Sequence, residues 1–392
     1  MSDNVPREVL IEILARLPVK SLLRCRSVCK SWYSLITNPS FITTHLNQTK
    51  SNNQLLIIKY TSRVPNQERY ISCSDDDTCD EFVELENPFH SSSKSFKIVG
   101  SCNGLLCISD YHGLDCAFLW NPSIRRFLIL PESGYSVTDS DLQFVFGFGF
   151  DRISNDYKVV KIGYLNDLET RGSGLCMMEL YALSTLSWRP ICVVDFRFEL
   201  YINTWSVFVN GAVHWVAFDP AKERGFGILI VAFDMGNEAF REMAVPSYQT
   251  NGRLYRNAAV AVLGESLAVI GFESDLVPAN LMCNFHIWVM EEYGVIESWT
   301  KRYTIIGQSI FSKVLGFRKN GNVLIDDGGF PRKLVSYDPQ SHQIKNLGVY
   351  GNSFNVYTYM ESLVALDGAD GVWESHEQVH LNSPDAIANK AA

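Results

Sequence analysis

The sequence has no excess of basic side chains. Its 392 residues include 34 Lys or Arg and 43 Asp or Glu, which gives a net charge of −9. Proteins that bind nucleic acid usually gather Lys and Arg on one face, where they meet the phosphates. This charge balance therefore argues against a nucleic-acid partner.

Long apolar runs are also missing. The longest, such as FVFGFGF and GILIVAF, have the length of a strand, and none approaches the roughly 18 consecutive apolar residues of a membrane-spanning helix. The opening MSDNVPREV lacks the basic region and apolar run of a signal peptide. We therefore expect no membrane partner, a cytoplasmic and/or nuclear location, and reduced thiols at the ten cysteines.

The motifs of phosphate-binding loops, nucleophile elbows and dinucleotide sites are missing or incomplete. The sequence contains neither G-x-x-x-x-G-K-[ST] nor G-x-S-x-G, and GFGFD at 147–151 lacks the third glycine of a dinucleotide fingerprint. We interpret His214, between Val213 and Trp215, as a hydrogen-bonded histidine of a sheet rather than a general base. We therefore expect the chain to be non-catalytic and to bind no cofactor.

One short segment matches a zinc motif. His376, Glu377 and His380 fit H-E-x-x-H, in which two histidines one helical turn apart bind zinc and the Glu acts as general base. Such a motif needs a packed helix and usually a third ligand, yet the only acidic residue that follows is Asp385. We interpret the match as chance in a flexible tail.

A second group of metal-ligating types is Cys102, Cys107, His112 and Cys116. Their spacings differ from the paired C-x₂₋₄-C of structural zinc sites. Cys102 and Cys107 flank a tight turn, so we expect both to point into the core of a sheet. No metal site is predicted.

The first fifty residues have the pattern of short helices. An apolar stripe at helical spacing comprises Val9, Leu10, Ile13, Leu14 and Leu17. Pro18 ends this helix, because the residue before a proline is pushed away from helical angles. A second run with helical spacing ends at Asn38-Pro39. Two or three helices in a segment this small rarely form a stable core alone, so their apolar face must pack on the β domain or on another protein.

Charge divides the chain at about residue 50. Residues 1–50 hold seven basic and three acidic side chains, a net of +4, which leaves 27 basic and 40 acidic for the remainder, a net of −13. A basic head on an acidic body is typical of a module that meets an acidic partner surface. Solvated Lys and Arg on helix faces explain the same charge equally well.

From about Leu55 the apolar period changes to two. Segments such as LLIIKY, KVVKIGY and FHIWVM have the β-branched and aromatic content of strands. Asn-Gly pairs at 103–104, 210–211 and 320–321 predict hairpin turns in which both central residues have positive φ.

A weak internal repeat indicates the architecture. A strand, a turn and a returning strand recur at 119–127, 180–191, 231–243, 287–303 and 334–347. The spacing of roughly 40 to 70 residues fits propeller blades with insertions. We predict a six-bladed β-propeller in which strands from Leu55 close the ring against Tyr357–Leu366, with a pair of β-sandwiches as the alternative. Tryptophans expected in the blade core are Trp120, Trp188, Trp215, Trp288 and Trp299.

Residues 5–36, VPREVLIEILARLPVKSLLRCRSVCKSWYSLI, resemble an F-box, the module that binds the Skp-type adaptor of cullin-based ubiquitin ligases. Val5 stands where a Leu-Pro opening is more usual. The adaptor-binding residues that the resemblance implies are Pro6, Leu10, Ile13, Leu14, Leu17, Pro18, Leu22, Leu23, Val28 and Trp32. The exposed cations expected at the rim are Lys20, Arg24 and Lys30.

The rest of the chain resembles the F-box-associated, kelch-like domain of plant F-box proteins. The segments that carry the resemblance are GSCNGLLCI, LWNPSIRRF, NGAVHW, VAFD, IWVMEEYG and SYDP. True kelch repeats carry a Gly-Gly pair in each blade, and here only Gly328-Gly329 occurs. The expected fold is mainly β with a small N-terminal α module. Its expected parts are an F-box helical module at 1–45, a linker at 46–54, a β-propeller-like domain at 55–373 and a flexible C-terminal tail at 374–392.

The two resemblances together imply a substrate-recognition adaptor of an SCF-type (Skp-cullin-F-box) ubiquitin ligase. The F-box is expected to bind the Skp-type adaptor, and through it cullin, while the β domain binds an unknown target protein and promotes its ubiquitination and degradation. The alternatives are a non-degradative F-box scaffold or ligand receptor, and a propeller metalloenzyme or hydrolase. Target contacts are expected in the loops Thr138–Asp141, Asn166–Gly174, Pro220–Gly225 and Ser274–Asn280.

Overall fold

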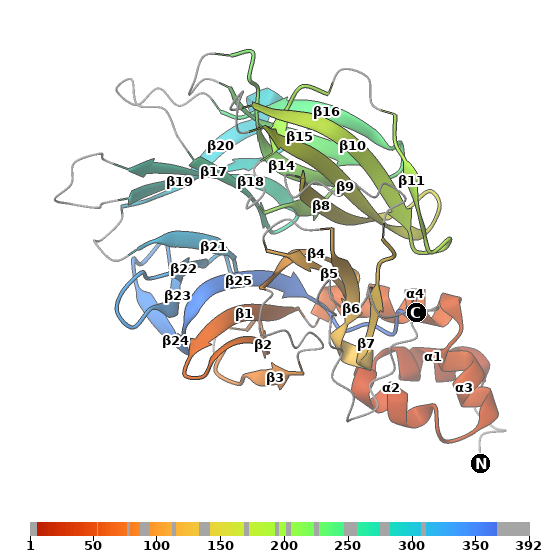
Figure 1. The fold of residues 1–392 in the computed structure, drawn as a ribbon. Coiled ribbons are helices and arrows are strands. Elements are labelled where there is room, and N and C mark those ends of the chain that lie inside the picture. Colours follow the sequence, from red (N-terminus) through yellow and green to blue (C-terminus); the bar gives the residue numbers. More distant parts are fainter. Residues whose placement is uncertain are drawn as a thin grey trace, which may run out of the picture.

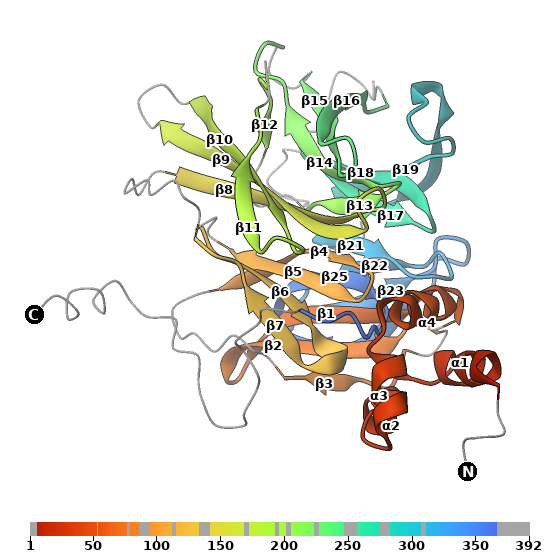
Figure 2. The same ribbon diagram turned by 90° about the vertical axis from the view of Figure 1, so that its right-hand side faces the viewer.

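The computed structural model describes residues 6–52, 54–76, 79–86, 95–111, 115–132, 142–167, 172–192, 196–200, 205–222, 227–246, 257–274, 283–306 and 311–366. The helices come first in the chain: α1 (Arg7–Ala15), α2 (Val19–Cys25), α3 (Lys30–Ile36) and α4 (Pro39–Asn52). All later helical segments in the described residues are the single 3₁₀ turns η1 (Pro122–Ile124) and η2 (Ile296–Ser298). Figures 1 and 2 show the four α-helices grouped at one edge of a large β domain.

The fourth helix was not predicted. Asn38-Pro39 ends the helical run as expected, but the same pair also begins α4. The side-chain Oδ1 of Asn38 accepts hydrogen bonds from the N–H of Ser40 at 2.9 Å and from its hydroxyl at 2.6 Å, which is N-capping. Pro39 takes the first helical position, where its missing N–H costs nothing. Most of residues 46–54, expected as a linker, therefore lie in α4.

The described strands form six antiparallel sheets. Blade 1 contains β1 (Leu55–Arg63), β2 (Asn66–Ser74), β3 (Val83–Leu85) and β25 (Asn352–Tyr359), and blade 2 contains β4 (Phe96–Cys102), β5 (Leu105–Asp110), β6 (Ala117–Asn121) and β7 (Arg126–Ile129). Blade 3 contains β8 (Leu142–Asp151), β9 (Asp156–Asp167), β10 (Gly172–Ala182) and β11 (Ser187–Pro190). Blade 4 contains β12 (Glu199–Leu200), β13 (Val207–Val209), β14 (Ala212–Phe218), β15 (Ile228–Asp234) and β16 (Ala239–Ala244). Blade 5 contains β17 (Asn257–Leu263), β18 (Ser266–Ser274), β19 (Cys283–Met290) and β20 (Trp299–Ile305), and blade 6 contains β21 (Lys313–Phe317), β22 (Val323–Asp326), β23 (Lys333–Tyr337) and β24 (Ile344–Tyr350).

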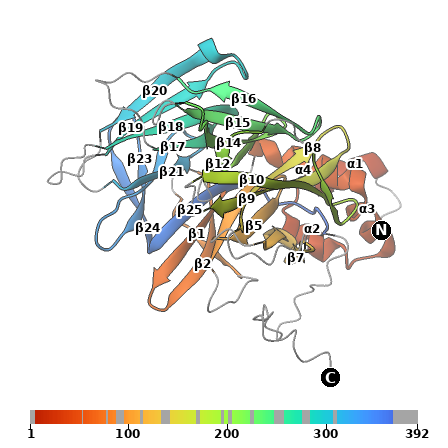
Figure 3. The ribbon, with the colours of Figure 1, turned by 45° about the horizontal axis from the view of Figure 1, so that its top comes forward.

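The six sheets make a closed propeller, which confirms the predicted fold class and blade count. Figure 3 shows the blades following one another around a common centre. The ring closes where β25 pairs with β1, with Leu55 opposite Tyr359 and Lys59 opposite Asn355. The closing strand ends at Tyr359, so the predicted closing segment Tyr357–Leu366 is a strand only at its start.

Apolar side chains fill the space between neighbouring blades. Six apolar clusters among the described residues each join one blade to the next. Trp215, for example, is fully buried between blades 3 and 4. Of the five tryptophans predicted as blade core, Trp120, Trp215 and Trp299 are buried in these clusters, and the half-buried Trp188 and Trp288 pack against them. Aromatic side chains thus fill the wedges between sheets, as predicted.

Two of the three predicted Asn-Gly hairpin turns are confirmed. At Asn103-Gly104 and Asn210-Gly211 both residues have positive φ and the turn has two residues. The prediction for 320–321 is wrong in its geometry, because only Gly321 has a positive φ, at 86°. There the connection runs from Phe317 to Val323, and the Arg318 N–H donates to the Asn322 carbonyl at 2.8 Å within it.

The internal repeat is the outer hairpin of the blades. The five repeated segments correspond to the third and fourth strands of blades 2 to 6. Asn121 and Asp234 end a third strand, and Asp338 directly follows one. Each accepts a hydrogen bond from the N–H two residues later, an Asx turn. In four of the five outer hairpins a residue of positive φ lies one or two positions before the fourth strand begins: Arg125, Leu186, Glu238 and His342.

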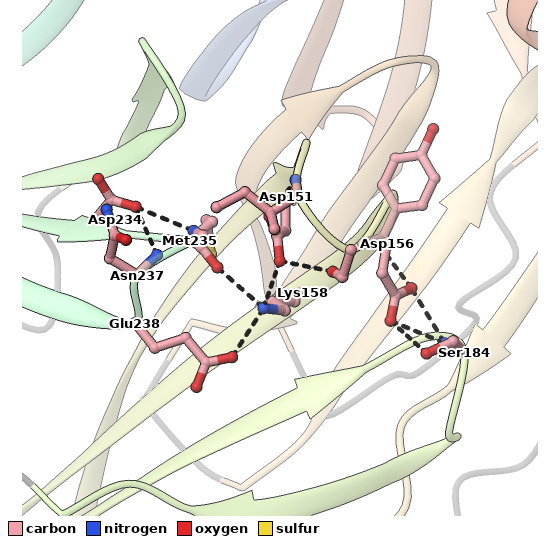
Figure 4. A network of polar contacts seen from close by, with 12 residues as sticks. Asp151, Asp156, Lys158, Ser184, Asp234, Met235, Asn237 and Glu238 are labelled. Atoms are coloured by element: carbon pink, nitrogen blue, oxygen red, sulfur yellow. Dashed lines mark hydrogen bonds and ion pairs between the residues drawn. The ribbon is translucent and has the colours of Figure 1, made fainter.

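A buried lysine joins blade 3 to blade 4 (Figure 4). The Nζ atom of Lys158 on β9 donates to Asp151 Oδ2 at 2.7 Å and Glu238 Oε1 at 2.8 Å, and to the Met235 carbonyl at 3.0 Å. Glu238 and Met235 belong to the turn between β15 and β16 of the next blade. A buried ammonium is tolerated only when it is paired in this way, so the contact fixes the two blades in register.

One cysteine pair departs from the expectation of reduced thiols. Cys73 at the end of β2 and Cys79 are joined as a disulfide. Both are buried beside the cluster that joins blade 6 to blade 1. Among the other cysteines in the described residues, Cys25, Cys29, Cys107 and Cys192 are free thiols.

Candidate partner-binding surfaces

The N-terminal helices share one small apolar core. The helical module, residues 6–52, buries side chains from all four helices: Leu14, Ala15, Val19, Leu22, Leu35, Ile36 and Phe41. Leu363, which follows β25, belongs to the same core and is 1% exposed. His45 of α4 is also buried, and its Nε2 lies 3.0 Å from the carbonyl oxygen of Leu17. The module therefore depends on the β domain for part of its core.

The structure divides the ten predicted adaptor-binding residues by exposure. Leu14 and Leu22 are buried within the module. Four are half-buried, namely Leu10, Leu17, Leu23 and Trp32, and four are exposed, namely Pro6, Ile13, Pro18 and Val28. The buried pair belongs to the module core, so only the exposed and half-buried residues are accessible for direct contact with a partner.

Four large apolar side chains of the module face solvent. Val9 and Ile13 lie one turn apart on α1 and are 44% and 52% exposed, while Val28 and Tyr33 are 64% and 57% exposed. Tyr33 is absent from the predicted set, although an aromatic residue next to Trp32 at the start of α3 was a usable signal. Lys20, Arg24 and Lys30 are exposed as expected. Apolar anchors surrounded by a polar rim are the usual anatomy of a docking surface.

Two segments of blade 2 attach the module to the propeller. They hold the bridging segment, residues 360–366, which carries Leu363. Asn121 is fully buried and its Nδ2 donates to the carbonyl oxygens of Ser362 at 3.2 Å and Val364 at 2.9 Å. Gly104 lies against the same segment, since a Cβ there would be 2.2 Å from the Ser362 hydroxyl.

The turn that follows Asn121 completes this attachment. η1 contacts α2, and its Ile124 packs against the module core. Segments GSCNGLLCI and LWNPSIRRF thus fix how the helices sit on the propeller. Beside this contact a cleft of about 1310 Å³ separates α2 from β3, with charged side chains of both signs along its walls.

The module lies at one end of the ring and most of the predicted target loops at the other. The first strand of each blade, which is β25 in blade 1 and β13 in blade 4, is the innermost, and neighbouring strands in a blade run in opposite directions. The connections between second and third strands therefore lie at the same end of the ring as the beginnings of the innermost strands. We call this end the loop side. η1 joins a third to a fourth strand, and the bridging segment follows the end of an innermost strand, so the module occupies the opposite end.

The predicted target loops are only partly within the described residues. Asn166 and Asp167 belong to β9, and residues 172–174 belong to β10, so these positions are strand rather than loop. Residues 220–222 form a turn and Ser274 ends β18. Residues 138–141, 168–171, 223–225 and 275–280 lie outside the described residues.

The histidine considered as a general base, His214, has a structural role. His214 is fully buried, and its Nε2 lies 2.8 Å from the hydroxyl of Tyr293. Burial lowers the pKa of His214 to about 4, so it is neutral near pH 7. This confirms the interpretation as a hydrogen-bonded sheet histidine.

The cysteines considered as metal ligands lie in the core. Cys102 and Cys107 are buried in the cluster between blades 2 and 3, as predicted, and burial raises the pKa of the Cys107 thiol. The part of the chain that the structure describes holds no group of three or more metal-ligating side chains. His112 and the segment His376–His380 lie outside the described residues. Within the described ranges, no helix has the length and apolar character needed to cross a membrane.

Comparison with known families gives two matches that together span nearly the whole chain. A model of the F-box domain matches residues 2–44, and a model of the F-box associated beta propeller domain matches residues 47–365. The chain is 28% identical to F-box protein At3g07870 of Arabidopsis thaliana, over 95% of this chain and 94% of that protein. It is 29% identical to F-box protein CPR1 of Arabidopsis thaliana, over 92% and 89%. Among solved structures, an oligogalacturonate lyase from Vibrio parahaemolyticus superposes with a TM-score of 0.42 at 9% identity, over 74% of this chain and 79% of that one.

Proposed function

Since this chain belongs to the F-box proteins that carry an F-box-associated β-propeller domain, we propose that it is the substrate-recognition subunit of an SCF-type ubiquitin ligase. In this role the helical module binds a Skp-type adaptor, and through it cullin, while the propeller binds a target protein. The observation that carries the proposal is the helical module, which matches the F-box model and exposes apolar side chains at the end of the ring away from the loop side.

The proposed mechanism is proximity. The subunit holds the target near the ubiquitin-charged enzyme and raises the effective concentration of the target's lysines without taking part in covalent chemistry. This requires a defined distance between the two binding surfaces. The bonds from Asn121 to the bridging segment and the contact of α2 with η1 support such a fixed arrangement.

The test is co-purification of the full chain with a Skp-type adaptor. We compare wild type with an Ile13→Asp, Val28→Asp variant, because both side chains are exposed and a charge there leaves the module core intact. Removing two apolar anchors from an interface is expected to weaken adaptor binding by at least about 100-fold. The matched control is Ile306→Asp, since Ile306 is 69% exposed on the loop side; it should bind the adaptor like wild type.

Circular dichroism confirms that each variant is folded. If wild type binds no Skp-type adaptor, or if the double variant binds as well as the control, the proposed docking role of the module is wrong. If the adaptor binds but a reconstituted ligase leaves bound target proteins unmodified, the non-degradative scaffold replaces the ligase subunit as the function.

A further inference from the structure

Two neighbouring turns on the loop side expose large apolar side chains. The β1–β2 turn presents Val64, which is 91% exposed, and the β22–β23 connection presents Phe330, which is 93% exposed. Figure 1 shows β22 and β23 at the left of the ribbon and the helical module at the right. Isolated exposed apolar residues are common on protein surfaces, so these two matter only because of what surrounds them.

The backbone beneath these side chains is held firmly. β1 and β2 stay paired up to Arg63 and Asn66, which leaves only Val64 and Pro65 in the turn. In the other connection the Asp327 carboxylate accepts hydrogen bonds from the N–H groups of Gly329 at 3.1 Å and Lys333 at 3.0 Å. Phe330 therefore extends into solvent from a fixed frame, so binding a partner requires little ordering of the backbone.

The two turns also bring cationic side chains together. The guanidinium carbon of Arg63 lies 4.3 Å from the centre of the Phe330 ring, a cation–π contact. Both residues line a hollow of about 500 Å³ together with Asn66, Gly328, Gly329, Arg332 and Asn352. Arg332 lies 3.5 Å from Asp326 and is 41% exposed. Arg63 forms no ion pair within the described part of the chain.

This surface has the opposite charge to the domain that carries it. Residues 51–392 have a net charge of −13, yet two arginines flank the exposed Phe330. Guanidinium groups bind carboxylates with two parallel hydrogen bonds. A partner that pairs with Arg63 and with the exposed part of Arg332, beside its contact with Asp326, is therefore anionic. One that removes Phe330 and Val64 from water is apolar beside that charge.

We propose that Arg63, Val64, Phe330 and Arg332, together the turn surface, bind an acidic segment of the target protein in which an apolar side chain stands next to Asp or Glu. This inference rests on the proposed function, because it assigns the target to this surface. The carboxylates pair with the two arginines, and the apolar side chain packs between the ring of Phe330 and Val64. Such a small surface binds a short extended segment rather than a folded face.

The experiment selects peptides from a random phage-displayed library on the full-length chain. Enriched sequences should combine an apolar residue with a neighbouring Asp or Glu. Synthetic versions are then titrated calorimetrically against wild type, Arg63→Glu with Arg332→Glu, and Phe330→Ser. We expect affinity to fall at least about tenfold for both variants and to weaken with added salt.

The matched control is Arg152→Glu with Ile153→Ser. This pair lies in the β8–β9 turn, where Ile153 is 78% exposed, and it should leave affinity within about twofold of wild type. Phe330→Ser changes no charge and removes no buried group, so a folding defect does not account for its effect.

Three outcomes would overturn the inference. The enriched peptides lack acidic residues, or they bind the turn-surface variants as well as wild type. Alternatively, sedimentation shows that wild type self-associates while the variants do not, which makes a second copy of the chain the occupant. Skp-type adaptor binding is measured on the same samples. If the chain binds the adaptor but no peptide, only the proposed role of the turn surface is wrong. If it binds peptides but no adaptor, the proposed ligase role is wrong.

Discussion

His214 shows how single polar residues of this chain serve the packing of the blades. It lies on β14 in blade 4 and contacts Tyr293, which follows β19 in blade 5. Alternation along the segment VHW predicts a histidine on a sheet. The partner was not predictable, because Tyr293 is 79 residues away in the sequence and only the closed ring brings the two together.

The lowered pKa of His214 predicts a pH dependence of stability. Burial is the main cause, the charge of Arg241 adds to it, and the folded-state pKa is about 4 against an ordinary 6.5. Protonation therefore favours the unfolded state, so this stabilisation is full above pH 6.5 and is lost as pH falls towards 4. Between pH 7 and pH 5 the loss should be about 2 kcal/mol of unfolding free energy.

Urea unfolding of wild type and His214→Gln at pH 7, 6 and 5 measures this loss. The Gln side chain retains hydrogen-bonding capacity toward Tyr293 and does not titrate. The unfolding free energy of the variant should therefore fall by about 2 kcal/mol less than that of wild type between pH 7 and pH 5. Equal slopes for the two proteins would show that His214 is not the group responsible.

At the scale of elements, local turn chemistry was predictable and contacts between elements were not. The repeated third-strand endings at Asn121, Asp234 and Asp338 mark the outer hairpins because an Asx turn is specified within a few residues. The hairpin turn at Asn103-Gly104 was predictable for the same reason, because two adjacent residues specify it. The start of α4 was missed because Asn38-Pro39 ends one helix and begins another.

Asn121 is expected to control how the helical module is attached. Asn121→Ala leaves the carbonyl oxygens of Ser362 and Val364 without their donor, which should cost about 1–3 kcal/mol. Because these residues flank Leu363 in the module core, amide hydrogen exchange should rise in residues 360–366 and in α1 to α3. Exchange in blades 4 and 5 should change little.

The control is Asn346→Ala, since Asn346 is exposed and its side chain bonds within β24, donating to the Tyr350 hydroxyl at 2.8 Å and accepting from the Gly348 N–H at 2.9 Å. It should leave exchange in the module unchanged. A uniform rise across all blades in Asn121→Ala would mean that this residue supports the whole fold rather than the attachment of the helices.

At the scale of the whole molecule, the period-two segments and their repeat predicted a closed propeller before any contact was known. The turn surface escaped prediction, because the exposure of Phe330 depends on where the first and last blades meet. The loops favoured from their polarity belong to connections on the loop side, three of them between the second and third strands of a blade, and their role as target contacts stays a prediction. Their side chains alone do not show which of them faces a partner.

The meeting of blade 6 with blade 1 is held by a buried ion pair as well as by β25. The Nε atom of Arg318, after β21, lies 3.0 Å from Asp75 Oδ1, after β2, and each side chain is 1% exposed. Arg318→Met should lower the free energy of unfolding by about 3–5 kcal/mol, because it leaves a buried carboxylate without its cation.

Arg302→Met is the control, since Arg302 pairs with Glu291 at 2.7 Å with both side chains about half exposed. It should lower the free energy of unfolding by no more than about 1 kcal/mol. Both values come from denaturant unfolding. Equal losses for the two variants would mean that ring closure rests on strand pairing and apolar packing alone. A much larger loss for Arg318→Met would mean that the buried ion pair also stabilises the junction of the first and last blades.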